Sequence, residues 1–355
     1  MADIFRVIDT GVRSGRANIA FDQALIEAHK VGLVPDTVRF LRFPPTALIG
    51  RHQALSRELD LDYCARNDIG VARRITGGGA IFFDENQLGW ELVLKRSTLP
   101  TPSLADLTAA ICTAAAAGIS RLGADARYRP RNDIEVDGRK ICGTGGFFDG
   151  DTLFFQGTLL IDADPKTMFS ALNVPQAKLI KRNLDDPSAR LVTLHEILGG
   201  DVPDLATIQA AMLRGFEDEL GISTAWGEIT EAEEAKARCV HDEEIGTDAF
   251  VAEIDDPEAD APVLSASRTG PGGTVAAYIR LEGPNRDRAR EVLLTGDFFV
   301  TPPRTIYDLE SSLRGLPVDD LGAAVDEFFA RSEVDLLTVT PADFRSVIET
   351  ALARD

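Results

Sequence analysis

A glycine loop entered by two arginines is the first segment of the chain that could do chemistry. It reads Arg73, Arg74, Ile75, Thr76, Gly77, Gly78, Gly79 and Ala80. Glycine has no Cβ, so the backbone N–H groups of such a loop can approach an anion closely. Guanidinium groups bind phosphate and carboxylate oxygens through paired hydrogen bonds. The loop therefore predicts an anion-binding site. The structural alternative is a flexible turn beside one exposed and one salt-bridged arginine.

A second polar segment follows downstream. It offers an amide, a carboxylate, an ammonium group and a run of small residues: Asn132, Asp133, Lys140, Gly143 and Thr144. A carboxylate such as Asp133 can hold a divalent cation or a ribose hydroxyl, although Asn–Asp pairs are also ordinary turn residues. Lys140 is expected at the beginning of a strand, where a lysine is usually solvated. Together, the two segments are suited to a phosphate-bearing, activated acid.

Helices and strands mix without a strict βαβ rhythm, which predicts an α+β domain with a mixed sheet. Apolar spacing indicates helices at 18–30 and 103–122, the second capped by Ser103. Strands are expected at 37–43, 47–50, 89–94 and 153–161. Gly157 inside the last strand indicates the close approach of a ligand or of backbone.

The length of 355 residues suits two domains. We expect a first domain over 1–240, an acidic linker over 241–262 and a smaller α+β domain over 263–355. Strands at 275–281 and 291–294 and helices at 306–313, 320–331 and 341–353 are predicted for the second domain.

The net charge of −20 is concentrated in one segment. Residues 217–260 hold sixteen acidic residues against two basic ones, a balance of −14. A solvated helix followed by a linker explains this segment better than a docking surface for a basic partner. Nucleic acid is not an expected partner, because phosphate binding needs clustered lysine and arginine.

The composition indicates a cytoplasmic protein. No apolar stretch is long enough for a membrane span, and the N-terminus does not resemble a signal peptide. The four cysteines are scattered without a CxxC pair, which argues against disulfides and a zinc site. They are Cys64, Cys112, Cys142 and Cys239.

Several motifs in order resemble those of lipoate–protein ligases. RRITGGGAIFFDENQLGWEL (73–92) is similar to their RRxxGGGAVFHD motif, and RNDIEVDGRKICGTGG (131–146) to their second motif. LFFQGTLLID (153–162) resembles their HHGTLLLD strand, and the likeness extends over most of residues 3–200. TGDFF (295–299) and the downstream LESSLRG resemble the small accessory domain of these ligases.

The resemblance implies a biotin/lipoate ligase-like catalytic domain of the class II synthetase type, joined to an α+β accessory domain. It also implies a two-step reaction. ATP and lipoate, with Mg²⁺, would give lipoyl-adenylate, and the lipoyl group would then pass to a lysine of an acceptor protein. The acceptor would be a 2-oxoacid dehydrogenase subunit, the glycine-cleavage carrier or a related lipoate-binding protein.

The resemblance also assigns residues by motif position. Lys140 would contact the acyl carboxylate and the adenylate phosphate as the catalytic residue. Asn132 and Asp133 would hold the nucleotide, with Asp133 as a metal ligand. The remaining residues of the predicted lipoyl-adenylate site are Arg73, Arg74, Gly77, Gly78, Gly79, Ala80, Gly143, Thr144, Gln156 and Gly157.

Three positions depart from the motifs. Phe83, Phe155 and Gln156 stand where these ligases commonly have histidines. A histidine role in proton transfer or ligand orientation is therefore absent, and we expect an altered acyl selectivity. His52 is the histidine nearest a motif, and we expect it at the surface.

Three rival functions remain open. An octanoyl transferase of the same fold would use a cysteine nucleophile, with Cys142 as the candidate, although a buried cysteine in a strand is the alternative. Some such transferases place the cysteine where this chain has Tyr128, Arg129 and Pro130. A biotin ligase has a different glycine loop. A non-catalytic binder of lipoylated proteins would not need Lys140, Asp133 and both arginines.

The accessory domain of these ligases closes over the active site, so it would exclude water from the adenylate. We therefore expect a chain ending near Val240 to transfer the lipoyl group from supplied adenylate but not to form the adenylate.

Overall fold

The computed structural model describes residues 4–99, 103–173, 187–259, 262–270 and 272–353. The chain forms two compact units. The first unit consists of Met1–Leu48, Leu59–Arg73 and Ile81–Val251. The second unit consists of Ile49–Glu58, Arg74–Ala80 and Ala252–Asp355. Asp260 and Ala261 of the expected linker lie outside the described residues.

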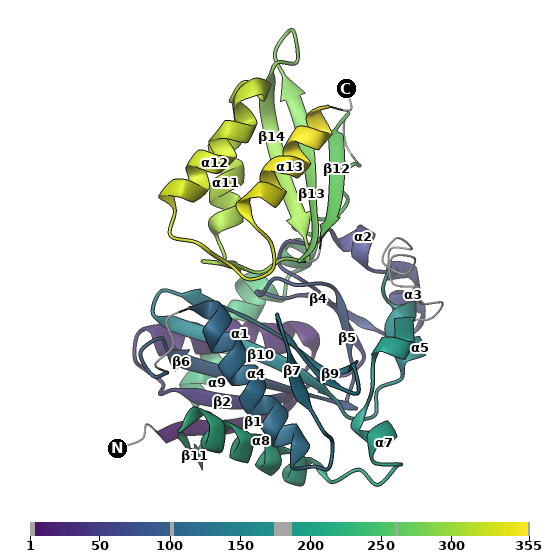
Figure 1. The fold of residues 1–355 in the computed structure, drawn as a ribbon, viewed down its shortest axis with the longest axis vertical. Helices are drawn as coiled ribbons and strands as arrows, with labels where there is room; N and C mark the ends of the chain where they lie inside the picture. Colours follow the sequence, from purple (N-terminus) through teal and green to yellow (C-terminus); the bar gives the residue numbers. More distant parts are fainter. Residues whose placement is uncertain (1–3, 100–102, 174–186, 260–261, 271, 354–355) are drawn as a thin grey trace. The chain divides into compact units, whose positions relative to one another are not determined.

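A mixed sheet of eight strands forms the centre of the first unit (Figure 1). The strands are β1 (Ile4–Val12), β2 (Thr37–Arg42), β6 (Gln87–Lys95), β7 (Arg127–Arg129), β8 (Asp133–Val136), β9 (Arg139–Asp149), β10 (Thr152–Leu160) and β11 (Ser223–Trp226). Their order is β11-β1-β2-β6-β10-β9-β8-β7. β1 is parallel to both of its neighbours, and the other pairs are antiparallel.

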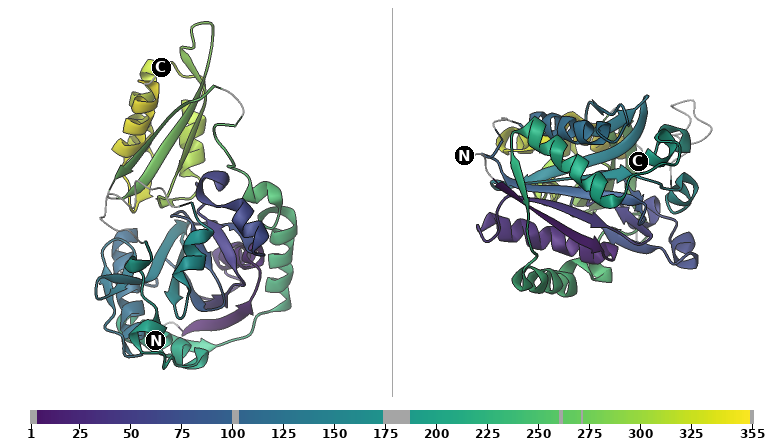
Figure 2. Two further views of the ribbon diagram at one scale, coloured as in Figure 1. Left: turned by 90° about the vertical axis from the view of Figure 1, so that its right-hand side faces the viewer. Right: turned by 90° about the horizontal axis from the view of Figure 1, so that it is seen from below.

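Helices cover both faces of this sheet (Figure 2). α4 (Leu104–Ser120) and α8 (Leu205–Leu220) pack together on one face, and α1 (Gly15–Lys30) and α9 (Glu231–Val240) pack together on the other. Alternate residues of β6, such as Leu88, Trp90 and Leu92, enter the core beneath α4 and α8. Ser103 caps α4 as predicted, because its side chain accepts from the Asp106 N–H.

A small sheet in the order β4-β3-β5 accompanies the large one. It consists of β3 (Thr46–Ile49), β4 (Gly70–Arg73) and β5 (Ile81–Phe83). The shorter helices are α3 (Leu61–Arg66), α5 (Pro165–Ser170), η1 (Pro187–Arg190), α7 (Leu194–Ile197), η2 (His241–Ile245) and α10 (Asp248–Val251). Two of them, η2 and α10, occupy the beginning of the expected linker and contribute buried Ile245 and Phe250.

The second unit contains a three-stranded antiparallel sheet of β12 (Leu264–Gly270), β13 (Gly273–Glu282) and β14 (Arg288–Gly296). β15 (Val300–Thr301) pairs with β16 (Asp335–Leu336). The helices are α2 (Leu55–Glu58), α11 (Thr305–Leu313), η3 (Val318–Asp320), α12 (Leu321–Arg331) and α13 (Pro341–Leu352). α11 packs on β14, and α13 packs on β12 and β13, which closes an apolar core.

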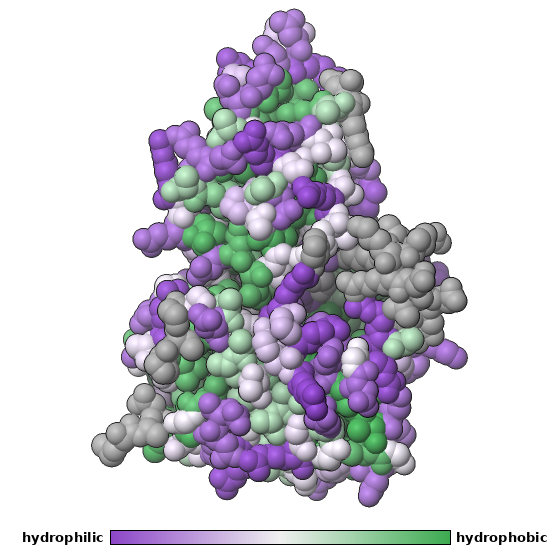
Figure 3. Space-filling view, viewed as in Figure 1, coloured by the Kyte–Doolittle hydropathy of each residue, from purple (hydrophilic) through white to green (hydrophobic). Residues whose placement is uncertain are grey.

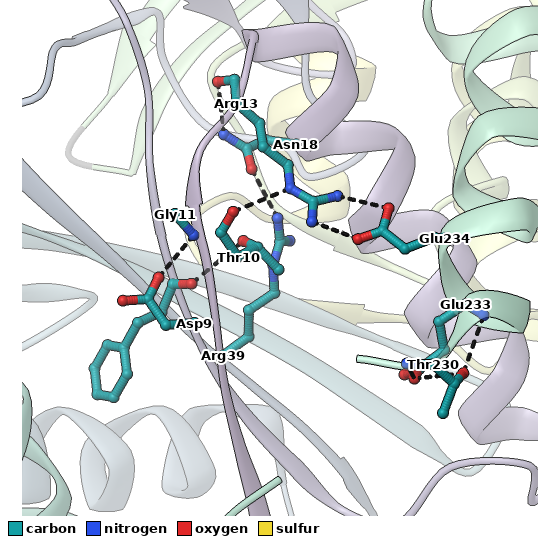
Figure 4. A network of polar contacts seen from close by, with 10 residues as sticks. Asp9, Thr10, Gly11, Arg13, Asn18, Arg39, Thr230, Glu233 and Glu234 are labelled. Carbon is teal, nitrogen blue, oxygen red and sulfur yellow. Dashed lines mark hydrogen bonds and ion pairs between the residues drawn. The ribbon is translucent and has the colours of Figure 1, made fainter. Parts of the chain in front are cut away.

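The acidic segment is ion-paired as well as helical. In the first unit Glu233 pairs with Arg6. Glu234 pairs with Arg13 (Figure 4). Glu233 also completes a capping box with Thr230, which begins α9. The predicted helix is therefore present, but two of its carboxylates neutralise an arginine of the first strand and one of the loop that follows it.

Among the residues that the structure describes, few large apolar side chains are exposed. The most exposed are Ile4, Val31, Leu33 and Trp226, and such scattered residues are normal on a protein surface. The face drawn in Figure 3 mixes hydrophilic and hydrophobic residues. Over the described ranges, no helix is long and apolar enough to cross a bilayer.

Candidate active site

A β-bulge decides which way Lys140 points. The register between β8 and β9 shifts at Glu135, so that β9 has one extra residue. Ile141 and Cys142 are both buried in the core that α4 covers. Lys140 is left on the opposite face, where its side chain lies over Gly143. Bulges beside functional sites commonly redirect a side chain in this way.

Lys140 is paired with Asp133, and Asp133 is also paired with Arg129. Lys140 Nζ lies 2.8 Å from Asp133 Oδ1, and the Arg129 guanidinium binds Asp133 Oδ2. A Cβ on Gly143 would stand 2.5 Å from Lys140 Nζ, so the Lys140 side chain fits over position 143 only because that residue has no side chain. Burial raises the pKa of Asp133, but Lys140 and Arg129 outweigh burial and hold that pKa below its ordinary value. Asp133 is therefore an ionised carboxylate between two cations.

These side chains belong to one row across the sheet. Successive strands place in register Arg129, Asp133, Gly143, Thr158 and Gly89. Gln156 lies two residues from Thr158 along β10, and hence on the same face, opposite Gly145. Of the two glycines in the row, Gly143 leaves room for the Lys140 side chain, whereas Gly89 is buried beneath Leu41.

Two predicted residues face the other side of the sheet. Thr144 Oγ1 lies 3.2 Å from Cys112 Sγ of α4 and donates to the Asn132 carbonyl. A Cβ on Gly157 would stand 2.2 Å from the Trp90 ring. Close packing therefore accounts for Gly157 without a ligand. Asn132 lies just before Asp133 and connects to Thr144 through backbone and side chain.

Arg73 points into the protein. Its side chain is buried, and its guanidinium donates to the carbonyls of Phe250 and Val251 at 2.9–3.2 Å. These carbonyls lie at the end of the four-residue helix α10, and they satisfy the buried guanidinium group. A contact of Arg73 with phosphate stays a prediction.

The glycine loop from Arg74 to Ala80 belongs to the second compact unit. The Gly78 N–H donates to the Phe298 carbonyl at 3.1 Å, and a Cβ on Gly77 would stand 2.0 Å from that carbonyl oxygen. Arg74 donates to the carbonyls of Gly77 and Gly79, and burial lowers its pKa to about 10. The glycines thus allow close packing on the protein's own backbone, and anion binding by the loop stays a prediction.

The three residues that replace the usual histidines, Phe83, Phe155 and Gln156, have different surroundings. Phe83 packs on Phe43 with ring centroids 4.4 Å apart, and Phe155 is buried beside Trp90. Only Gln156 of the three lies on the face of Lys140. The prediction that His52 lies at the surface is wrong, because His52 is 2% exposed and stacks on Phe298 within the second unit.

The surroundings of the four cysteines disfavour the thiolate form. Burial raises the pKa of both Cys112 and Cys142 to about 12. Burial also raises the pKa of Cys64. Cys239 is exposed, but a hydrogen bond with Glu243 raises its pKa. A nucleophilic cysteine needs a thiolate and hence a lowered pKa.

The described residues contain no cluster of three or more histidine, cysteine or acidic side chains that could hold a metal ion. Asp133, the predicted metal ligand, uses both carboxylate oxygens on Lys140 and Arg129. A magnesium ion bound mainly by substrate phosphates needs only one or two carboxylates. A Mg²⁺ ion carried by the nucleotide is compatible with this arrangement.

The sequence did not single out Arg129 or Thr158 as site residues. Both join the site through strand register, which pairs Arg129 with Asp133 and Thr158 with Gly143. The sequence could have indicated them only through their neighbours, since Arg129 lies shortly before the Asn132–Asp133 pair and Thr158 directly follows Gly157. In the first unit the structure thus gathers Lys140, Asp133, Gly143 and Gln156 on one face.

The family is established by comparison. The model of the lipoyl protein ligase A/B catalytic domain matches residues 14–217. The chain therefore belongs to this family of lipoate ligases and octanoyltransferases, as its motifs predict.

Individual relatives include both activities. Octanoyltransferase LipM of Symbiobacterium thermophilum is 30% identical, over 69% of this chain and 96% of that protein. A bipartite lipoate protein ligase of Thermoplasma acidophilum, analysed with its E2 lipoyl domain, is 25% identical, with a TM-score of 0.62 over 71% of this chain and 97% of its own. LipL1 of P. falciparum, in complex with lipoate, shares the fold at 14% identity, with a TM-score of 0.71 over 99% of both chains. The predicted α+β lipoate ligase fold is confirmed.

Proposed function

We propose that the protein is an ATP-dependent lipoate–protein ligase, which converts lipoate and ATP to lipoyl-adenylate and pyrophosphate and then lipoylates a lysine of an acceptor protein. The state of the cysteines carries this proposal. A thioester-forming transferase needs a reactive thiolate, whereas burial raises the pKa of Cys142 and of Cys112 to about 12. Activation by ATP needs no cysteine.

Lys140 has the charge and the position for the first step. The lipoate carboxylate attacks the α-phosphorus, so two anions must approach each other, and a fixed cation lowers the cost. The Lys140 ammonium group lies over Gly143, beside a sheet surface of small and polar residues that includes Thr158 and Gln156. Asn132, Asp133, Arg73, Arg74 and the glycine loop are proposed to complete the lipoyl-adenylate site. Mg²⁺ would neutralise phosphate charge as part of the nucleotide substrate.

The second step is an acyl transfer. The amine of the acceptor lysine attacks the carbonyl carbon of the mixed anhydride, a C–N bond forms, the C–O bond to phosphate breaks, and AMP leaves. The amine loses its proton in this step. Because the ligase from Thermoplasma acidophilum was analysed with its E2 lipoyl domain, a lipoyl domain of a 2-oxoacid dehydrogenase is the first acceptor to test.

Octanoyl transfer is the second candidate. It is supported by the 30% identity to an octanoyltransferase LipM over most of that protein. This reaction would move an octanoyl group from a carrier-protein thioester to the acceptor without ATP.

Pyrophosphate exchange separates the two activities. We expect the purified protein to exchange labelled pyrophosphate into ATP only when lipoate is present, and to increase the mass of a lipoyl domain by one lipoyl group. C142A should retain most of this activity, since the thiol is buried in the core. ATP-independent transfer from octanoyl carrier protein that C142A abolishes would instead establish the transferase.

A further inference from the structure

The ion pair between Lys140 and Asp133 competes with the binding of a substrate anion by Lys140. The ammonium group rests 2.8 Å from Asp133 Oδ1, so it must weaken this contact to meet a substrate anion. The Asp133 side chain is only 22% exposed. A partly buried carboxylate that loses its counter-ion is costly, because little water replaces the lost contact.

Arg129 is placed to remain with Asp133 when Lys140 leaves. It stands directly opposite Asp133 in the β7–β8 pair and binds the other carboxylate oxygen, Oδ2. Glu135, two residues along β8, holds the same guanidinium at 3.2 Å. Arg129 is therefore fixed by two carboxylates on a neighbouring strand, independently of Lys140.

We propose that Arg129 is a positioning residue that keeps Asp133 neutralised, so that Lys140 can pass from Asp133 to the substrate anion at low cost. Asp133 is then the resting counter-ion of Lys140. This inference rests on the proposed function, because it assumes that Lys140 works on an anionic substrate. Arg129 itself does not contact the substrate.

The test compares R129Q with R127Q. Arg127 lies on the same strand, but it is exposed and pairs with Asp125 rather than Asp133. We expect R129Q to lower the kcat of lipoate-dependent pyrophosphate exchange about tenfold, with the KM for ATP changed by less than about twofold. R127Q should match the unmodified protein, and R129K should retain most of the activity because it keeps one cation on Asp133. Equal effects of R129Q and R127Q would refute the proposal.

A double-mutant cycle asks whether Arg129 acts through Asp133. Once the carboxylate is removed in D133N, Arg129 has nothing to neutralise, so R129Q should cause no further loss in that background. If R129Q lowers kcat by the same factor with Asp133 and with Asn at that position, Arg129 does not act through Asp133 and the proposal is wrong.

A measurement that needs no activity separates this inference from the proposed function. The rate at which Lys140 is reductively methylated, followed by peptide mass spectrometry, reports how tightly its amine is held. R129Q should slow this labelling several-fold relative to R127Q, because Lys140 becomes the main cation on Asp133, and D133N should remove the difference. If the unmodified protein makes no adenylate, the proposed function fails, and the labelling still decides whether Arg129 governs the Lys140–Asp133 pair. Unchanged labelling in R129Q would overturn the inference.

Discussion

The Lys140 ammonium group reaches Asp133 because position 143 has no side chain. A Cβ there would stand 2.5 Å from Nζ and 2.7 Å from Cε of Lys140. Both atoms are at the far end of a flexible side chain, so the lysine can move aside without disturbing the sheet. Position 143 thus controls where the charge lies more than it controls stability.

G143A should therefore displace Lys140 and leave the fold intact. We expect adenylate formation to fall about tenfold, as for the loss of one preorganised charge contact, with a melting temperature close to that of the unmodified protein. G70A is the matched control, because the nearest atom to its new Cβ lies at an ordinary 3.5 Å. Normal pyrophosphate exchange by G143A would show that Lys140 does not need the space over position 143 for adenylate formation.

At the scale of elements, α1 is joined to the large sheet by a buried ionic cluster. Arg39 of β2 binds Asp22 of α1 and Glu91 of β6, and also reaches Asn18 and Thr10 (Figure 4 shows Arg39 with the last two). Two carboxylates share one guanidinium group where all three side chains are buried. Burial raises the pKa of Glu91 well above its usual range, and the nearby Asp22 adds to this shift.

This cluster predicts a pH-dependent stability. The pKa of Glu91 is higher in the folded state than in the unfolded state, so its contribution is complete below the unfolded pKa of about 4.3 and is lost as the pH rises toward the raised value. E91Q mimics the protonated acid and should flatten this decline in the free energy of unfolding, measured in urea between pH 5 and pH 9. E27Q, on α1 but exposed and paired with Lys236, should leave the decline unchanged. A parallel loss of stability in E91Q at every pH would contradict a protonated Glu91.

At the scale of the whole molecule, Arg73 binds residues that follow Val240, the expected end of the first domain. The buried guanidinium is bonded to the carbonyls of Phe250 and Val251, which a chain ending at Val240 lacks. The first compact unit likewise extends to Val251.

A chain ending at Val251 should consequently be more stable than one ending at Val240, by about 3 kcal/mol for a buried cation that keeps its partners. Urea unfolding of the two truncated chains measures the difference. Both lack residues 252–355, so any effect of losing that region is common to them. Equal unfolding free energies would mean that the contacts of Arg73 with α10 contribute little.

Local pattern accounts for the elements that the sequence predicted well. The helix at 103–122 follows from apolar spacing and from the Ser103 cap, and the strand at 153–161 follows from a run of β-forming residues. The departures arise where distant segments meet. His52 lies beside a charged, polar stretch of sequence, yet Phe298, far along the chain, covers it.

By itself, the sequence determined the family and the residues that could carry charge, because the motifs RRITGGGA and RNDIEVDGRK survive as short, contiguous runs. Only the tertiary structure decided what those residues face. A register shift in β9 turned Lys140 toward Gly143 and Asp133 and left Cys142 in the core. Long-range packing bound Arg73 to α10 and joined the glycine loop to the second unit. Strand register and contacts between distant segments depend on the free energy of the whole fold, which no local pattern contains.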